Sequence, residues 1–270
     1  MQENQERIER DGVSLAVRRS GQGPTVLLIN GTAPPLWGDL PGLLAATHHV
    51  VAYDRRSFGD SPAPPPATDG TATHAEDAAA VLAKTSSGPA LVVGWSMGAV
   101  IALELACRHP EAVAGLVLLE PPFRPREHPS RPMLRAVAGV IPLARFGRHE
   151  AAAERFLRWA LARRNGSSAY ADAGPEWASE VRRQGPAIVA EVAAGEKLGL
   201  DALAALTTPV TIVVGGQSDR MFPAAARTLA DTIPSATVTE VPESGHALPF
   251  DAAPAVADAV RRHGAAPGSH

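Results

Sequence analysis

The stretch that most constrains the fold is a run of β-forming residues that passes through a serine directly into a helical pattern. The sequence LVVGWSMG occupies residues 91–98, and helical spacing follows over residues 99–108. A serine at so sharp a turn takes a strained backbone conformation, and glycines two positions away on each side let neighbouring chain pass without Cβ clashes. The turn sets the Ser96 hydroxyl at a helix N-terminus, where the Met97 amide can stabilise an oxyanion. The motif therefore predicts a nucleophile; a glycine-rich turn without catalysis is the alternative.

Strand and helix patterns alternate on both sides of this turn. Further strands are expected over residues 13–19, 25–29, 49–53, 113–119, 209–215 and 237–241, and helices over 37–46, 73–83, 224–232 and 251–262. Such alternation is typical of α/β proteins with a mostly parallel, doubly wound sheet, in which ligands bind at the carboxyl ends of the strands. We predict one sheet of about eight strands. Thr32, Ser96 and Glu120 lie at such strand ends.

Residues 121–206 interrupt the alternation. They contain no strand-like run, and their helical patterns are broken by Pro and Gly. A connection between parallel strands is usually far shorter than a stretch of about 85 residues. We therefore predict a core domain formed by residues 1–120 and 207–270, and a helical cap formed by residues 121–206. Most aromatic residues of the cap are expected to pack it onto the core, and one or two to line a substrate pocket.

Two further residues that follow predicted parallel strands are expected at the same rim as Ser96. These are Asp219 and His246. A serine hydroxyl becomes a good nucleophile when a base takes its proton, and imidazole titrates near neutral pH. A carboxylate then fixes the tautomer of the ring and stabilises the imidazolium. The three residue types together predict a catalytic triad.

The chain order of serine, acid and histidine resembles that of the α/β-hydrolase family, and the likeness covers about residues 5–263. The sequence YDRRSFGDS at 53–61 is similar to a loop of the family, GQSD at 216–219 to its acid turn, and SGH at 244–246 to its histidine loop. The insertion after Glu120 lies where the family carries its cap. The resemblance implies a serine hydrolase whose oxyanion hole is formed by the amides of Thr32 and Met97.

The identity of the acid and two departures from the family pattern bear on this resemblance. The G-x-x-D turn favours Asp219 as the acid. Glu120 is the alternative, because certain lactonases of the family take their acid from the end of that strand. A third interpretation gives Glu120 a purely structural role. Asn30 replaces the usual histidine, and because either side chain can hydrogen-bond the loop backbone, we expect the oxyanion hole to persist. Ser57 replaces a glycine, and a positive φ there would cost up to roughly 1–2 kcal/mol.

Composition and charge argue against several other classes of function. A net charge of −3 gives no electrostatic basis for a nucleic-acid or anionic-membrane partner. Cys107 is the one cysteine, and no histidine pair has metal-ligand spacing, so we expect neither a disulfide, nor a metal, nor a cofactor. Residues 1–11 lack the apolar segment of a cleaved signal, and no apolar run approaches the roughly 20 residues of a membrane span. We expect a cytoplasmic, bacterial protein, and leave monomer or homodimer open.

We predict a serine hydrolase that cleaves a small carboxylic ester or lactone through an acyl-enzyme on Ser96, with His246 as general base. One alternative keeps the triad but performs cofactor-free perhydrolysis, as haloperoxidase-like members do, or hydrolysis of a C–C bond. A second alternative is a ligand-binding member without catalysis. A serine at the turn argues against the dehalogenases and epoxide hydrolases of the family, which need a carboxylate there. The sequence does not name the substrate.

Overall fold

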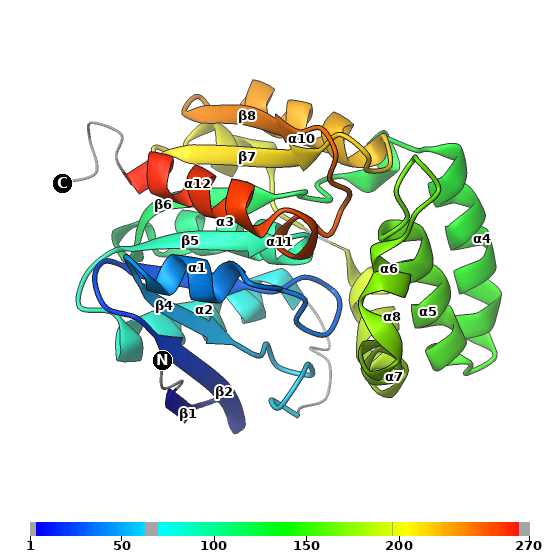
Figure 1. Ribbon diagram of the computed structural model, residues 1–270, viewed down its shortest axis with the longest axis horizontal. Coiled ribbons are helices and arrows are strands. Elements are labelled where there is room, and N and C mark those ends of the chain that lie inside the picture. The colour runs from blue at the N-terminus through cyan, green and yellow to red at the C-terminus, as the bar shows by residue number, and fades with distance from the viewer. Residues whose placement is uncertain (1–3, 63–69, 196, 265–270) are drawn as a thin grey trace.

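The computed structural model describes residues 4–62, 70–195 and 197–264, and its centre is an eight-stranded sheet (Figure 1). The strand order is β1-β2-β4-β3-β5-β6-β7-β8. β1 pairs antiparallel with β2, and β2 with β4, whereas the other pairs are parallel. The predicted α/β class and the mostly parallel sheet are confirmed. The strands are β1 (Asn4–Arg10), β2 (Val13–Ser20), β3 (Thr25–Ile29), β4 (His49–Tyr53), β5 (Ala90–Trp95), β6 (Val113–Leu119), β7 (Val210–Gly215) and β8 (Ala236–Val241).

Helices cover both faces of this sheet because its central strands are apolar on both sides. In β3, Leu27 and Ile29 belong to one hydrophobic cluster, and Val26 and Leu28 belong to another on the opposite face. Successive strand residues point to opposite faces, so a continuous apolar run needs a layer of helices on each side. The helices of these layers are α1 (Leu40–Ala45), α11 (Leu248–Asp251) and α12 (Ala253–Gly264) in front, and α2 (Gly70–Thr85), α3 (Met97–Arg108) and α10 (Met221–Thr232) behind (Figure 1).

The edge strand β1 is absent from the strands predicted by periodicity. It is polar, and Ile8 is its one residue in the main hydrophobic cluster. Its pairing with β2 over residues 4–10 and 13–19 supplies the backbone hydrogen bonds that make it a strand. An edge strand with one buried side chain leaves almost no hydrophobic period in the sequence.

Between β6 and β7, the described residues form helices and short turns. Figure 1 shows α4–α8 beside the carboxyl ends of the strands, and we call these the cap helices. α9 (Leu200–Ala204) packs instead against α3 and α10 of the core. The rim that holds Ser96 therefore faces the cap helices. Their bounds are α4 (Arg131–Arg145), α5 (His149–Ala160), α6 (Ala169–Asp172), α7 (Gly174–Arg183) and α8 (Gly185–Ala194), and short 3-10 helices lie at Pro110–Ala112 and Pro125–Glu127.

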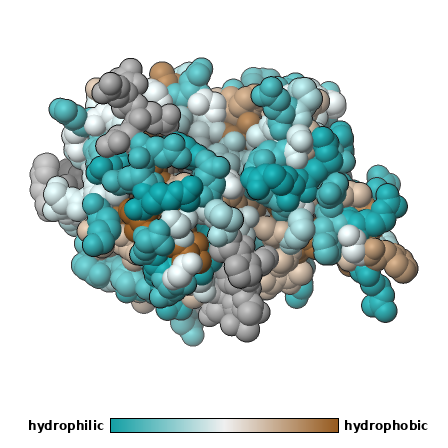
Figure 2. All heavy atoms as spheres, turned by 90° about the horizontal axis from the view of Figure 1, so that it is seen from below, coloured by the Kyte–Doolittle hydropathy of each residue, from teal (hydrophilic) through white to brown (hydrophobic). Residues whose placement is uncertain are grey.

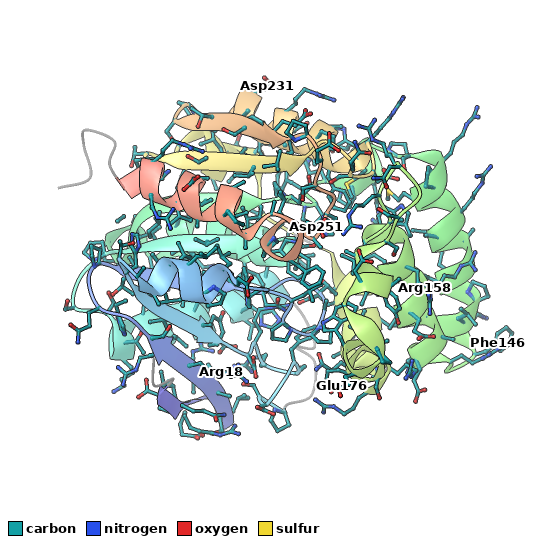
Figure 3. The ribbon with its side chains drawn as sticks, in the orientation of Figure 1. Arg18, Phe146, Arg158, Glu176, Asp231 and Asp251 are labelled. Atoms are coloured by element: carbon teal, nitrogen blue, oxygen red, sulfur yellow. The ribbon has the colours of Figure 1, made fainter. Side chains whose placement is uncertain are left out.

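The surface is mainly hydrophilic when seen from below, with hydrophobic residues confined to small areas (Figure 2). Large apolar side chains are nevertheless exposed on and just after α4, namely Leu134, Ile141 and Phe146. Phe146 points outward at the far edge of the cap helices (Figure 3). Within residues 4–62, 70–195 and 197–264, no helix combines the length and the apolar character that crossing a bilayer requires.

Candidate active site

Ser96 occupies the turn between β5 and α3, as the sequence motif predicted. Its backbone is strained, with φ at 55° and ψ at −124°. A Cβ on Gly94 would overlap the backbone of α3, and a Cβ on Gly98 would overlap the carbonyl of Ile29. The two glycines are therefore required by close backbone approach. Met97 is the first residue of α3, a position at which the amide has no acceptor within its own helix.

The imidazole of His246 lies beside the Ser96 hydroxyl. Its Nε2 atom is 3.0 Å from Ser96 Oγ. The histidine follows β8, and its backbone carbonyl accepts a 2.7 Å hydrogen bond from the indole of Trp95, the residue before the serine. The Phe222 ring stacks on the imidazole with a centroid distance of 3.9 Å. The contacts from Trp95 and Phe222 hold the ring in a defined orientation beside the hydroxyl.

The carboxylate next to this imidazole belongs to Glu120. Its Oε2 atom lies 3.2 Å from Nδ1 of His246, and its Oε1 accepts a 2.6 Å hydrogen bond from the Gly215 amide. Glu120 follows β6, has φ at 53° and is 0% exposed. Burial raises the pKa of the Glu120 carboxyl, and the hydrogen bonds with His246 and Gly215 oppose that rise. Ser96, His246 and Glu120 thus form one continuous chain of contacts.

The contact with His246 that we expected of Asp219 is therefore made by Glu120. Asp219 lies at the same rim, but its carboxylate accepts hydrogen bonds from Ser130 Oγ at 2.7 Å, Trp159 Nε1 at 3.2 Å and the Met221 amide at 3.0 Å. Two of these donors lie on or beside the cap helices, and the third begins α10. Asp219 thus connects the rim to the cap helices.

The loop after β3 packs directly against the serine. A Cβ added to Gly31 would lie 2.8 Å from Cβ of Ser96, so no larger residue fits without displacement. The Asn30 amide donates to the carbonyl oxygens of Gly31, at 3.2 Å, and of Ala33. These hydrogen bonds brace the loop backbone, as we expected of Asn30. The buried Thr32 lies in the same loop.

The loop after β4 contains the second departure from the family pattern. Ser57 has φ at 73°, the positive value that favours glycine, and its buried hydroxyl has no hydrogen-bond partner among the described residues. Neighbouring Arg56 pairs with Asp77 of α2 through two hydrogen bonds of 2.6 and 2.7 Å. Ser57 therefore holds the left-handed backbone conformation that favours glycine, although it carries a side chain.

An ion pair joins the core to the cap region near the histidine loop. Asp251 of α11 lies where the core meets the cap helices (Figure 3). Its carboxylate accepts hydrogen bonds of 2.6 and 3.1 Å from Arg163, which follows α5. The same carboxylate accepts a 3.0 Å hydrogen bond from the Gly245 amide, next to His246. This contact steadies the loop that carries the imidazole.

A narrow cavity opens beside Met97. Phe58 and His74 line it from the core, and Ala187 and Ala190 line it from α8. Apolar atoms make up most of its walls, and the charged side chains of Arg56 and Glu191 also line it. Within the part of the chain that the structure describes, no three His, Cys, Asp or Glu side chains gather in a way that could hold a metal ion.

Sequence reasoning missed several residues that surround this site. No role was assigned from the sequence to Phe222, nor to His74, which lies in the helix predicted over residues 73–83. Arg55 and Glu191 also received no role, although Arg55 is 0% exposed and its Nη1 lies 2.6 Å from Glu191 Oε1. The adjacent arginines in the loop after β4 were the available signal. Their partners lie tens of residues away, so spacing alone could not separate their roles.

Comparisons with known proteins agree with the fold described above. A family model described as the alpha/beta hydrolase family matches residues 26–259. A pimeloyl-acyl-carrier-protein methyl ester esterase from Chromobacterium violaceum is 31% identical over 251 residues, which cover 88% of this chain and 92% of that protein. The structure of a thermophilic esterase from Thermogutta terrifontis has a TM-score of 0.72 and 26% identity, with 96% of this chain and 97% of that one covered.

A more distant structure shares the fold with a still higher TM-score. It is the 2-hydroxy-6-oxo-6-phenylhexa-2,4-dienoate hydrolase from Rhodococcus sp. strain RHA1, with a TM-score of 0.79, 20% identity, and 98% of this chain and 99% of that one covered. The fold and the matches together define a hydrolase enzyme. Because the family model spans most of its length, the chain belongs to the alpha/beta hydrolase family.

Proposed function

We propose that this hydrolase cleaves small carboxylic esters or lactones through an acyl-enzyme on Ser96. The observation that carries the proposal is the continuous chain of contacts from Ser96 Oγ to His246 Nε2, and from His246 Nδ1 to Glu120 Oε2, at 3.0 and 3.2 Å. A hydroxyl, an imidazole and a buried carboxylate in this order are the parts that acyl transfer needs. Of the two candidate acids, the geometry supports Glu120.

In the first half of the reaction, Oγ of Ser96 attacks the acyl carbon while Nε2 of His246 takes its proton. The amides of Met97 and Thr32 stabilise the oxyanion of the tetrahedral intermediate. When the intermediate collapses, the bond to the alkoxy oxygen breaks, and His246 gives its proton to the leaving alcohol. Glu120 stabilises the transient imidazolium through Nδ1.

In the second half, His246 removes a proton from a water molecule that attacks the acyl-enzyme. The same two amides stabilise the second oxyanion. When it collapses, the bond to Ser96 Oγ breaks, His246 returns its proton to Oγ, and the carboxylic acid is released. In a lactone the leaving alcohol stays attached to the acyl group, so the single product is a hydroxy acid. The half-buried position of Ser96 leaves its hydroxyl within reach of a substrate from the rim.

The cavity beside Met97 supports a small substrate. The small side chains of Ala187 and Ala190, together with the Phe58 ring, form a narrow and mainly apolar space next to the proposed oxyanion donor. Such a narrow space favours a short acyl group over a long one. The C. violaceum relative, named as a methyl ester esterase, supports ester hydrolysis in general, whereas its particular substrate is not carried over.

The test is a panel of p-nitrophenyl esters and lactones of increasing acyl length, assayed with wild type and Ser96→Ala. We expect turnover of the short members by wild type and none by the variant, with unchanged circular dichroism. A fluorophosphonate probe should label wild type and leave Ser96→Ala unlabelled. Equal turnover by the two proteins would refute the proposal, and a lack of turnover and labelling would favour the ligand-binding alternative.

The other two reactions on the same triad need separate measurements. Perhydrolysis would appear as bromide-dependent halogenation when acetate and hydrogen peroxide are supplied. Hydrolysis of a C–C bond would appear as turnover of a dienoate ketone that contains no ester. We expect both rates to be far below that of short-ester hydrolysis.

A further inference from the structure

The fully buried guanidinium of Arg55 joins the loop beside Ser96 to a cap helix. Its Nη2 donates a 2.7 Å hydrogen bond to the carbonyl of Gly31 and a 2.9 Å hydrogen bond to Glu191 of α8. Its Nη1 donates to the other oxygen of Glu191 at 2.6 Å. One side chain thus connects the loop after β4, the loop after β3 and the cap helices.

The acceptor on Gly31 belongs to the same peptide unit as the Thr32 amide. Peptide units are planar, and none of the described bonds is cis, so the Gly31 carbonyl and the Thr32 N–H point in opposite directions. A hydrogen bond that fixes the carbonyl therefore fixes the direction of the N–H as well. Because the donor is a cation, it also draws electron density toward the carbonyl and strengthens the N–H as a donor.

Glu191 holds the guanidinium in the position that this hydrogen bond requires. The two form a fork-to-fork pair, and the Glu191 side chain is 13% exposed. Burial alone would raise the pKa of Glu191, but the charge of Arg55 and hydrogen bonds from His74 and Arg55 hold it well below its usual range. Glu191 is therefore ionised at neutral pH, and the pair keeps its geometry with little freedom to rotate.

We propose that Arg55 is a positioning residue that orients and polarises the Gly31–Thr32 peptide, and that Glu191 makes this function depend on the cap helices. The proposal rests on the function proposed above, in which the Thr32 amide receives the oxyanion. Displacement of α8 would remove the partner of Arg55 and loosen the oxyanion loop. The cap helices would then contribute to the catalytic rate and not only to substrate selection.

Lysine and methionine at position 55 separate positioning from simple packing. Methionine fills a similar volume but donates nothing to Gly31 or Glu191. Lysine keeps the charge, but it lacks the planar fork that reaches both acceptors at once. Glu191→Gln keeps the shape of the cap partner and removes its charge. Arg18→Met is the control, because Arg18 also forms a two-bond pair with a buried carboxylate, that of Asp54, while its own side chain is 30% exposed.

The experiment measures kcat, KM and the affinity for a trifluoromethyl ketone whose adduct with Ser96 carries an oxyanion. Removing an oxyanion donor outright costs about 10²–10³-fold in kcat, so loss of its orientation should cost about 10–100-fold in Arg55→Met. KM should change by less than about 3-fold, because the donor acts mainly in the transition state. Affinity for the ketone should fall in parallel with kcat. Arg55→Lys should recover part of the loss, Glu191→Gln should lower kcat about 3–10-fold, and Arg18→Met should keep kcat within about 2-fold.

The outcomes distinguish this inference from the proposed function. Wild-type kcat and ketone affinity in Arg55→Met and Glu191→Gln would overturn the inference while Ser96-dependent ester turnover still stands. Equal losses in Arg18→Met would also overturn it, because they would show a general effect of removing a two-bond ion pair. Failure of wild type to turn over any ester would overturn both. If Arg55→Met does not fold, the kcat and the ketone affinity of the folded variant Glu191→Gln test the inference.

Discussion

The Glu120 carboxylate lies 3.2 Å from Nδ1 of His246 although the two residues are separated by 126 positions in the chain. The sheet order places Glu120 next to Ser96. β6, which ends just before Glu120, lies directly beside β5, which ends just before Ser96. Asp219 follows β7, one strand further from the serine. The acid that contacts the imidazole is thus the one on the strand adjacent to the nucleophile.

Asp219 has a structural role at the rim. Its carboxylate accepts hydrogen bonds from Ser130, which caps α4, and from Trp159 of α5. The Trp159 ring in turn stacks on Phe222 with a centroid distance of 6.1 Å, and Phe222 stacks on His246. Trp159 of the cap helices therefore supports the His246 imidazole through the Phe222 ring, and Asp219 fixes Trp159.

The two carboxylates should respond differently to amide substitution. We expect Glu120→Gln to lower kcat by about 10³–10⁴-fold, because an amide neither fixes the productive tautomer nor stabilises the imidazolium. Asp219→Asn should lower kcat by less than about 10-fold, since it disturbs cap contacts that act at a distance. Steady-state kinetics on a short p-nitrophenyl ester measures both effects. A larger loss in Asp219→Asn would assign the acid to that residue instead.

Gly31→Ala should damage catalysis more than stability. The added Cβ would lie 2.8 Å from Cβ of Ser96 and 3.0 Å from the Trp95 carbonyl, so the oxyanion loop must move. We expect kcat to fall by about 10²-fold or more, and the free energy of unfolding by about 1–3 kcal/mol. Gly42→Ala is the control, because an added Cβ meets no atom within 4 Å there and lies within α1. It should keep kcat and raise stability slightly in urea unfolding. Unchanged kcat in Gly31→Ala would contradict the proposed oxyanion loop.

Ser57→Gly should stabilise the protein. The substitution removes a side chain from a position with φ at 73° and removes a buried hydroxyl without a partner in the described structure. Relief of backbone strain is worth about 1–2 kcal/mol, while the extra freedom of glycine in the unfolded chain costs about 0.5–1 kcal/mol. We expect a net gain of up to about 1 kcal/mol in thermal or urea unfolding. Ser57→Ala keeps the strain and should gain less; the reverse order would show that the hydroxyl dominates.

His74 should make stability depend on pH. Burial and the nearby charge of Arg55 lower the pKa of its imidazole below 6.5 in the folded state. The unfolded chain then binds a proton more readily, so the stability is fully present above pH 6.5 and is lost as the pH falls through the lowered value. Between about pH 7.5 and 5.0, wild type should lose more free energy of unfolding than His74→Gln, by on the order of 1 kcal/mol. Urea unfolding at the two pH values provides the measurement, and equal losses would contradict the prediction.

Local patterns in the sequence were sufficient for most of the architecture. The continuous apolar run at β3 required helices on both faces, and the G-x-S-x-G turn placed Ser96 between strand and helix with the expected strain. The edge strand β1 was missed because its single buried residue, Ile8, leaves no period to detect. Hydrophobic periodicity shows which faces of a strand are buried. It therefore predicts a strand best when the strand has a neighbouring strand on each side in the sheet.

The sequence by itself determined the mostly parallel sheet, the turn that exposes Ser96, the helical insertion and the strand ends at which functional side chains could gather. Only the tertiary structure decided which carboxylate reaches His246, that Arg55 reaches both Gly31 and Glu191, and that Phe222 stacks on the imidazole. The reason is physical. Local propensity and burial depend on neighbours along the chain, whereas a contact between side chains depends on the order and twist of strands that long connections bring together.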